Sequence, residues 1–317
     1  MGTQEVVLVL GIPASGKSSL TEAQFAGHTR LNRDAEGGSL EALHGPLRAA
    51  LSRGESVVLD NTYATRALRL PVIEIARSQG VRARCVWVDT SIEDAQVNAT
   101  TRMVKRYGRL LDEPELKKVS KTDPGAFGPG VLFRYRKVFE APDAAEGFDA
   151  VERVKFQRAA QGPEYQQKAV LLDFDGTLRK TLSGEHYPTD PDDIALLPGR
   201  RERLAALAAE GYRFFGVSNQ SGISKGSLTR EAAEACFERT LALLGQRFEV
   251  GYCPHNPAPI SCWCRKPMPG LGVAFVERHH LKRSDTVMVG DMTTDQTFAK
   301  RLGVAYADAA HFFGPTG

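Results

Sequence analysis

The stretch that most restricts the fold is residues 168–178, KAVLLDFDGTL. A continuous apolar run that ends in a Gly-Thr turn is typical of a central parallel strand, because helices cover both faces of such a strand. Asp173 and Asp175 follow this run, at the strand end where open α/β sheets bind their ligands. Residues two apart on a strand point the same way, so both carboxylates are expected to face one pocket. The alternative is a buried strand that ends in an acidic turn.

The length of the chain favours more than one domain. At 317 residues it exceeds a single ordinary core, so we expect two α/β domains. We place the first at residues 1–158, a linker with a Gly-Pro break at 159–167, and the second at 168–317. No apolar run approaches the roughly 20 residues that a membrane helix needs. We therefore expect a cytoplasmic protein that does not bind a membrane.

Residues 11–18 read G-x-x-x-x-G-K-S, between the apolar strand expected at 5–10 and an amphipathic segment. This pattern predicts a P-loop, in which backbone N–H groups at a helix N-terminus hold phosphates. Lys17 is expected to reach the β- and γ-phosphates of a nucleotide, and the Ser18 hydroxyl to bind Mg²⁺. The expected nucleotide-binding residues are Gly11, Ala14, Ser15, Gly16, Lys17, Ser18 and Ser19.

Acidic residues follow the next two expected strands. Asp34 could accept the proton of an attacking hydroxyl, and the alternative is an N-cap for the helix expected at 40–51. Asp60 follows the strand at 56–59, where a carboxylate could hold a metal-bound water. The helix expected at 65–79 and the strand at 82–88 continue the β-α-β alternation of a parallel sheet.

The segment 102–137 has an excess of six positive charges. Such a run can attract phosphates, or it can be an ordinary solvated helix and loop. Tyr135 could stack on a base or pack in a core. The ten basic residues are Arg102, Lys105, Arg106, Arg109, Lys117, Lys118, Lys121, Arg134, Arg136 and Lys137; the four acids are Asp112, Glu113, Glu115 and Asp123.

Polar residues also follow later strands of the second half. The Ser218 hydroxyl could bind a phosphate oxygen or be a simple turn serine, and Asn219 is next to it. Lys266 could neutralise a nucleophile and a substrate phosphate, with help from Arg265. Asp291 is expected to complete an oxygen-rich Mg²⁺ site with Asp173 and Asp175; Asp295 follows one helical turn later.

Four thiol and imidazole groups fall in one short loop: Cys253, His255, Cys262 and Cys264. The pattern C-x-H followed by C-x-C supplies the four ligands of a closed tetrahedral Zn²⁺ site. We read this zinc as structural because no ligand position remains for water. The alternative is a loop with reduced free thiols.

The first half resembles the 5′-kinase domain of polynucleotide kinase-phosphatases. The resemblance spans nearly all of residues 5–157 and rests on the P-loop together with the runs LNRD (31–34), LDNT (59–62), FEAP (139–142) and EGF (146–148). It implies that Asp34 activates a polynucleotide 5′-hydroxyl and that Arg102 is a lid arginine on the transferring phosphoryl group. Arg33 and Arg69 would bind the substrate, and Asn98 matches an asparagine of the helix that carries the lid arginine.

The second half resembles the haloacid dehalogenase superfamily, in particular its histidinol-phosphate and heptose-bisphosphate phosphatase branch, and also the 3′-phosphatase domain of polynucleotide kinase-phosphatases. The motifs are D-x-D-G-T (173–177), S-N-Q (218–220), R-K-P (265–267) and G-D-x-x-x-D (290–295). By this resemblance Asp173 is the nucleophile and Asp175 the acid/base. Mg²⁺ would bind to Asp173, Asp291 and the Asp175 carbonyl, and the substrate to Ser218, Asn219 and Arg265.

Together these resemblances imply an end-healing enzyme. It would phosphorylate 5′-hydroxyl ends of DNA or RNA with ATP or GTP, remove 3′-phosphates, and prepare ends for a ligase. The alternative is a sugar or sugar-phosphate kinase fused to a sugar-phosphate phosphatase. A catalytically inactive module that binds strand breaks is a third hypothesis.

Overall fold

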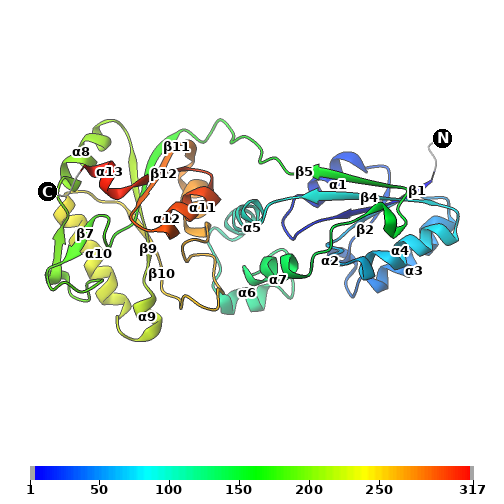
Figure 1. Cartoon of the computed structure of the whole chain (residues 1–317), viewed down its shortest axis with the longest axis horizontal. Helices are drawn as coiled ribbons and strands as arrows, with labels where there is room; N and C mark the ends of the chain where they lie inside the picture. Colours follow the sequence, from blue (N-terminus) through cyan, green and yellow to red (C-terminus); the bar gives the residue numbers. More distant parts are fainter. Residues whose placement is uncertain (1–3, 315–317) are drawn as a thin grey trace. The chain divides into compact units, whose positions relative to one another are not determined.

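The computed structural model describes residues 4–314 (Figure 1). The chain divides into two compact units. The N-terminal unit comprises residues up to Ala99 and Val119–Arg158, and the C-terminal unit comprises Thr100–Lys118 and the residues from Ala159 on. The division between Arg158 and Ala159 lies at the start of the expected linker. Residues 100–118 differ from the expected arrangement, because they group with the C-terminal unit.

The N-terminal unit is built on a five-stranded sheet in the order β2-β3-β1-β4-β5, with every pair parallel. β1 lies in the middle because its residues Val6–Leu10 are apolar and fully buried. The strands are β1 (Glu5–Leu10), β2 (Thr29–Leu31), β3 (Val57–Asp60), β4 (Arg82–Asp89) and β5 (Ala150–Lys155).

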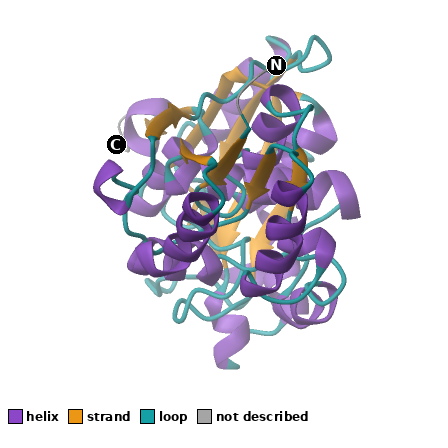
Figure 2. Cartoon of the chain, turned by 90° about the vertical axis from the view of Figure 1, so that its right-hand side faces the viewer, coloured by secondary structure: helices purple, strands orange, loops and turns teal. Residues whose placement is uncertain are grey.

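Helices accompany this sheet, as expected for β-α-β connections. They are α1 (Lys17–Gln24), α2 (Arg33–Glu36), α3 (His44–Ser52), α4 (Arg66–Ser78) and α7 (Gly130–Val138), with the 3₁₀ helices η1 (Glu41–Leu43) and η2 (Ala144–Glu146). α5 (Ile92–Tyr107) and α6 (Glu113–Val119) cross the division between the units. In the view of Figure 2, helices lie on either side of the strands.

The C-terminal unit has a second parallel five-stranded sheet in the order β10-β9-β6-β11-β12. β6, the strand of the D-x-D motif, lies at its centre, and residues 169–172 are fully buried. The strands are β6 (Gln167–Leu172), β9 (Arg213–Asn219), β10 (Glu249–Cys253), β11 (Leu281–Gly290) and β12 (Ala305–Asp308). The expectation of two α/β domains with parallel sheets is confirmed.

The helices of this unit are α8 (Arg200–Ala209), α9 (Ser221–Lys225), α10 (Arg230–Leu244), α11 (Gly270–His279), α12 (Thr293–Leu302) and α13 (Ala309–Phe313), with the 3₁₀ helix η3 (Pro191–Asp193). Residues 179–193 begin with a strand. β7 (Arg179–Thr181) pairs antiparallel with β8 (Ile194–Leu196). Strands of three residues are too short for alternation to be seen in the sequence.

Across the described residues, no helix combines the length and the apolar character that a membrane crossing requires.

Candidate active sites

The P-loop follows β1 and leads into α1. Its backbone needs glycine at two points, since Gly16 has φ 90° and a Cβ on Gly11 would lie 2.6 Å from the Val88 carbonyl oxygen. Ala14 also has a positive φ of 63°. No side chain caps the N-terminus of α1. The backbone N–H groups there suit an anion, as the sequence predicts.

Two side chains from outside the P-loop donate hydrogen bonds to its backbone carbonyls. The Thr90 hydroxyl donates to the Ser15 carbonyl at 3.0 Å, and the Asn98 amide of α5 donates to the Ala14 carbonyl at 2.9 Å. Thr90 was missed in the sequence, where an isolated threonine after a strand gives no signal. Both contacts fix the curvature that presents the loop N–H groups.

Lys17 lies inside the curve of the P-loop. Its Nζ donates to the carbonyls of Gly11 and Ile12 at 3.0 Å each and to the Ser15 hydroxyl at 3.3 Å. The side chain is buried, so the ammonium is held beside the loop where phosphates are expected. Ser19, the last expected nucleotide-binding residue, is exposed on the first turn of α1.

Ser18 and Asp60 are brought together although they are 42 residues apart. The Ser18 hydroxyl donates to Asp60 Oδ2 at 2.9 Å, and Asp60 is 1% exposed at the end of β3. Arg30 of β2 pairs with the same carboxylate oxygen. Burial lowers the pKa of Arg30, but Asp60 and Glu22 together outweigh burial and raise it. Hydroxyl and carboxylate oxygens are ligands that suit Mg²⁺ and its waters. Sequence reasoning missed Arg30.

Asp34 lies in the first turn of the short helix α2. The N-cap is Asn32, whose side chain accepts from the Asp34 N–H at 2.8 Å and donates to the Asp60 carbonyl. The Asp34 carboxylate is exposed and pairs with Arg33 at 2.9 Å. In the segment expected to be helical at 40–51, η1 and α3 have Leu40 and Leu43 as their N-caps, so the alternative role of Asp34 as an N-cap of that helix is wrong. Its carboxylate is accessible, as a base for an incoming hydroxyl must be.

Arg69, expected to bind substrate, is completely buried. Its guanidinium makes a two-fold ion pair with Glu146 at 2.5 and 2.7 Å and donates to the carbonyls of Tyr63 and Glu140 at 3.0 Å. This arrangement holds α4 against the segment that contains η2. The expected substrate contact must be corrected, because a side chain with no exposed surface cannot reach a substrate.

Arg102 is exposed on α5, four residues after Asn98. Residues at this spacing lie on the same face of a helix, so Arg102 shares the face whose Asn98 contacts the P-loop. The lid role that the resemblance implies for Arg102 stays a prediction.

Ion pairs offset part of the positive charge of the basic segment 102–137. Carboxylates pair with some of its members: Lys105 with Glu277, Arg109 with Glu115, and Lys117 with Glu113. The Arg109 guanidinium lowers the pKa of Glu115 to about 2. Tyr135 is buried, stacks on Phe139 and donates to the Thr62 carbonyl at 3.2 Å, so it is a core residue.

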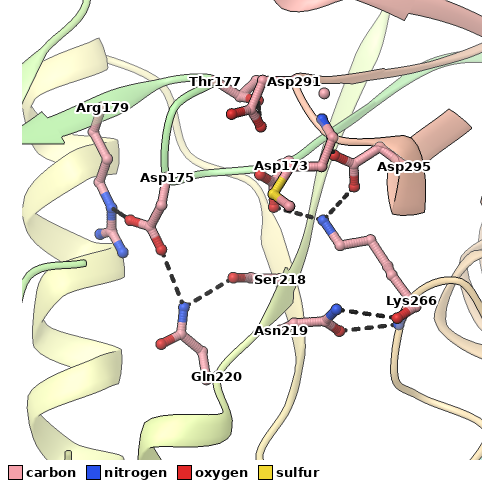
Figure 3. Close-up of polar contacts among 12 residues, drawn as sticks. Asp173, Asp175, Thr177, Arg179, Ser218, Asn219, Gln220, Lys266, Asp291 and Asp295 are labelled. Carbon is pink, nitrogen blue, oxygen red and sulfur yellow. Dashed lines mark hydrogen bonds and ion pairs between the residues drawn. The ribbon is translucent and has the colours of Figure 1, made fainter. Parts of the chain in front are cut away.

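In the C-terminal unit, three carboxylates lie close together, and one ammonium group contacts two of them (Figure 3). Carboxylate oxygens of Asp173, Asp291 and Asp295 all lie within 4.8 Å of one another. Lys266 Nζ lies 2.5 Å from Asp173 Oδ1 and 2.6 Å from Asp295 Oδ1. We call these four residues the carboxylate cluster. The sequence placed Lys266 beside the nucleophile, but it did not indicate the pair with Asp295.

Crowding perturbs the titration of this cluster. Burial raises the pKa of Asp291, and the charge of Asp173 raises it further. Burial alone would lower the pKa of Lys266, but Asp173 and Asp295 outweigh it and raise that pKa. Such a concentration of carboxylate oxygens fits a divalent cation, which offsets their mutual repulsion. Asp173 and Asp291 are the residues whose side chains would hold it.

The Asp175 carboxylate turns away from this cluster. Arg179 Nε donates to its Oδ1 at 2.8 Å, and the Gln220 amide lies 3.5 Å from its Oδ2. Gln220 also donates to the Ser218 hydroxyl at 2.9 Å, so the expected phosphate-binding serine is connected to the expected acid/base. Neither Arg179 nor Gln220 was singled out as functional in the sequence.

The side chains of Asn219 and Arg265 form hydrogen bonds with the backbone of other residues. The Asn219 amide both donates to the carbonyl and accepts from the N–H of Lys266, at 3.1 and 2.9 Å. Arg265 donates to the His255 carbonyl at 3.3 Å. These contacts orient Lys266 and the Cys/His loop. The contacts with substrate that were expected for Asn219 and Arg265 stay predictions.

The four expected zinc ligands converge. Cys253 Sγ lies 3.6 Å from Cys262 Sγ and 3.5 Å from His255 Nδ1, which lies 3.3 Å from Cys264 Sγ. Hydrogen bonding to Cys253 and the proximity of Cys262 raise the pKa of the Cys264 thiol. A bound cation would remove this cost of gathering thiolates. Zn–S distances of about 2.3 Å give tetrahedral edges of about 3.8 Å, so the set fits Zn²⁺. We call these residues the zinc cluster.

These two sites define the class of protein. One unit carries a P-loop with a paired serine and aspartate, and the other carries an aspartate pair on a central strand with a lysine and a third carboxylate. The chain combines a P-loop kinase domain with a phosphatase domain of the haloacid dehalogenase type.

Comparison with protein families agrees with this division. Residues 6–118 match the family described as "AAA domain", and residues 168–313 match "Polynucleotide kinase 3 phosphatase". The D-glycero-beta-D-manno-heptose-1,7-bisphosphate 7-phosphatase of Pseudomonas putida is 32% identical over 43% of this chain and 78% of its own length. Through its C-terminal domain, the chain belongs to the same family of phosphatases as this heptose bisphosphate phosphatase.

This chain is also similar to part of a longer protein and to a solved structure of a single phosphatase. The bifunctional polynucleotide phosphatase/kinase of Schizosaccharomyces pombe is 32% identical over 49% of this chain, but the match spans only 34% of that protein. A crystal structure of D,D-heptose 1,7-bisphosphate phosphatase from B. bronchiseptica is 28% identical and covers 44% of this chain and 79% of its own, with a TM-score of 0.40.

Proposed function

We propose that this protein heals broken nucleic-acid ends. Its P-loop domain transfers the γ-phosphate of ATP or GTP to a 5′-hydroxyl, and its phosphatase domain removes a 3′-phosphate. The observation that carries the proposal is the match of residues 168–313 to the polynucleotide kinase 3 phosphatase family in a chain whose other domain is a P-loop kinase. DNA or RNA ends are the substrates, and a ligase is the partner that uses the products.

In the kinase reaction, Asp34 accepts the proton of the 5′-hydroxyl as its oxygen attacks the γ-phosphorus in line. The bond from the γ-phosphorus to the β-phosphate oxygen breaks, which releases ADP or GDP. Lys17, the P-loop N–H groups and Arg102 stabilise the negative charge of the transferring group. Ser18 and Asp60 would hold a Mg²⁺, which would supply positive charge against the phosphates. The accessible Asp34 carboxylate and the contact between Ser18 and Asp60 support these roles.

In the phosphatase reaction, Asp173 attacks the phosphorus and the bond to the leaving oxygen breaks, which gives a phospho-aspartate. Asp175 protonates the leaving oxygen, then takes a proton from the water that hydrolyses the phospho-aspartate. Lys266 and Ser218 hold the phosphoryl oxygens. Mg²⁺ bound at Asp173 and Asp291 would offset the negative charge of substrate and nucleophile.

We also propose that the zinc cluster binds a structural Zn²⁺, since its four protein ligands leave no position for water.

The test is transfer of labelled γ-phosphate to a 5′-hydroxyl oligonucleotide, beside phosphate release from a 3′-phosphorylated one. Asp34→Ala should abolish only the first reaction and Asp173→Ala only the second. Glu36→Ala and Asp192→Ala are control variants, because both acids are exposed; Glu36 lies two residues from Asp34, and Asp192 belongs to the same unit as Asp173. Both controls should retain both activities.

A second candidate is a sugar or sugar-phosphate kinase fused to a sugar-phosphate phosphatase. The 32% identity to a heptose bisphosphate phosphatase favours it. If the intact protein ignores both oligonucleotides but consumes sugar phosphates, this second function replaces the first.

A further inference from the structure

Arg179 begins β7, four residues after Asp175, and its side chain is buried although it carries a full charge. It is 1% exposed. A buried guanidinium is costly unless it is paired and hydrogen-bonded. Within residues 4–314, Asp175 is the one carboxylate in ion-pair distance of it, with Nε 2.8 Å from Oδ1.

The other contacts of Arg179 fix the guanidinium from the opposite side. Its Nη1 donates to the Cys236 carbonyl at 2.7 Å and to the Thr240 hydroxyl at 2.9 Å, both on α10. The rings of Phe174 and Phe237 lie 5.2 and 5.3 Å from its central carbon. The guanidinium therefore cannot follow a moving carboxylate. It holds Oδ1 in one place relative to α10.

The backbone of the D-x-D loop supports the same geometry. The Gly176 N–H donates to the Arg179 carbonyl at 3.0 Å, and the Arg179 N–H donates to the Phe174 carbonyl at 3.1 Å. This tight turn places the arginine beside the aspartate. The Asp175 side chain stays 24% exposed, so it remains accessible to a substrate while it is held.

With Oδ1 held by Arg179, Oδ2 faces the other way. Figure 3 shows Arg179 and Gln220 approaching Asp175 from different sides. Gln220 connects Oδ2 to Ser218, which is expected to hold the phosphate. Oδ2 is thus the oxygen on the side of Ser218, where the phosphate of an ester is expected.

We propose that Arg179 is a positioning residue that fixes the Asp175 carboxyl so that Oδ2 donates its proton to the leaving oxygen. This inference rests on the phosphatase activity proposed above. In the balanced step, Asp173 forms a bond to phosphorus, the ester P–O bond breaks, and the proton of Asp175 moves to the departing oxygen to give an alcohol. The substrate class that depends on Arg179 is therefore the aliphatic phosphate ester, whose alkoxide cannot leave without a proton.

The test compares aryl and aliphatic phosphate esters in the first turnover, by rapid quench. p-Nitrophenyl phosphate releases a stable phenolate and needs no proton, whereas glycerol 2-phosphate and a 3′-phosphorylated oligonucleotide release an alkoxide oxygen. Arg179→Met should slow the aliphatic esters about 100-fold and the aryl ester less than about tenfold, since general acid catalysis contributes roughly 10²–10⁴-fold. Arg179→Lys should recover part of the loss on aliphatic esters.

Two further variants separate positioning from stability. Arg200→Met is the matched control, because Arg200 is also buried, donates to the Thr177 carbonyl of the same loop and lies over Phe313. It should slow both esters by one common factor. Asp175→Asn should show the selective pattern of Arg179→Met, and the double variant should be no slower than Asp175→Asn alone, because coupled residues are not additive.

Equal losses on aryl and aliphatic esters in the Arg179 variants would overturn the inference and leave the phosphatase function intact. If Arg179→Met does not fold, the ratio of the two rates in Arg179→Lys decides in the same way. Absence of turnover by the wild-type protein on every ester would refute the proposed phosphatase function and the role of Arg179 with it.

Discussion

Replacing Lys266 with methionine should destabilise the C-terminal unit strongly in the absence of metal. Lys266 is 4% exposed and lies between Asp173 and Asp295, which are 8% and 0% exposed. Methionine is apolar and of similar length, so it keeps the packing but leaves buried carboxylates without their cation. The loss of unfolding free energy therefore measures the electrostatic part of the interaction between Lys266 and the two carboxylates.

Removing one partner of a buried ion pair typically costs about 3–5 kcal/mol. Since Lys266 serves two carboxylates, we expect the upper half of that range, about 4–5 kcal/mol. With an m value of about 2–3 kcal/mol/M in urea, the unfolding midpoint should fall by about 1.3–2.5 M. Lys300→Met is the control, because Lys300 is exposed on the neighbouring helix α12 and should cost less than about 0.5 kcal/mol.

Tryptophan fluorescence can report on this unit alone. The chain has two tryptophans, and only Trp263 belongs to the C-terminal unit, where it is 1% exposed. Urea unfolding in EDTA should therefore be followed in a Trp87→Phe background. Added Mg²⁺ should reduce the deficit of Lys266→Met, because a cation replaces the missing charge.

A second substitution tests the cause. Asp295→Asn keeps an acceptor for the Met292 N–H but removes one buried charge. Combined with Lys266→Met it should be less destabilising than Lys266→Met alone, by about 1–3 kcal/mol of coupling. Two results would refute this reasoning. One is a loss of unfolding free energy below about 1 kcal/mol for Lys266→Met in EDTA, and the other is a double variant that is less stable than Lys266→Met.

Three other predictions concern separate parts of the chain. Arg69→Met leaves Glu146 buried and unpaired, so thermal unfolding should show a loss of about 3–5 kcal/mol in the N-terminal unit; a variant of normal stability would contradict this. Ser18→Ala removes the hydroxyl that contacts Asp60, so phosphate transfer should fall about 100-fold and need more Mg²⁺; an unchanged rate would exclude a metal role. Burial raises the pKa of Cys85 to about 12, so only about 10⁻⁴ of it is thiolate at pH 8 and iodoacetamide should spare it. Chelation should expose the zinc cluster to the same reagent, and mass spectrometry distinguishes the sites.

Much of the site could be predicted because its motifs are local. The P-loop is one turn between a strand and a helix, and eight consecutive residues specify it. Asp173 and Asp175 follow one apolar strand. In the zinc cluster, two pairs of ligands each span three residues, so spacing alone brings each pair together. The catalytic roles carried over to these residues stay predictions.

Long-range pairs could not be predicted in this way. Arg69 and Glu146 are 77 residues apart, and no local pattern distinguishes a buried arginine on α4 from an exposed one. The contact between Asp295 and Lys266 likewise depends on how α12 follows β11. The short strands β7 and β8 form only because they pair with each other.

The sequence by itself determined two parallel α/β sheets, the loop that would hold a nucleotide, and the strand ends that carry aspartates. These features depend on neighbouring residues and on the apolar periodicity of single elements. Tertiary structure alone decided which charges share a buried site: Lys266 with two carboxylates, Ser18 with Asp60, and Arg179 with the fixed surface of α10. The physical reason is that burial and pairing energies depend on distances between segments, which the order of residues does not record.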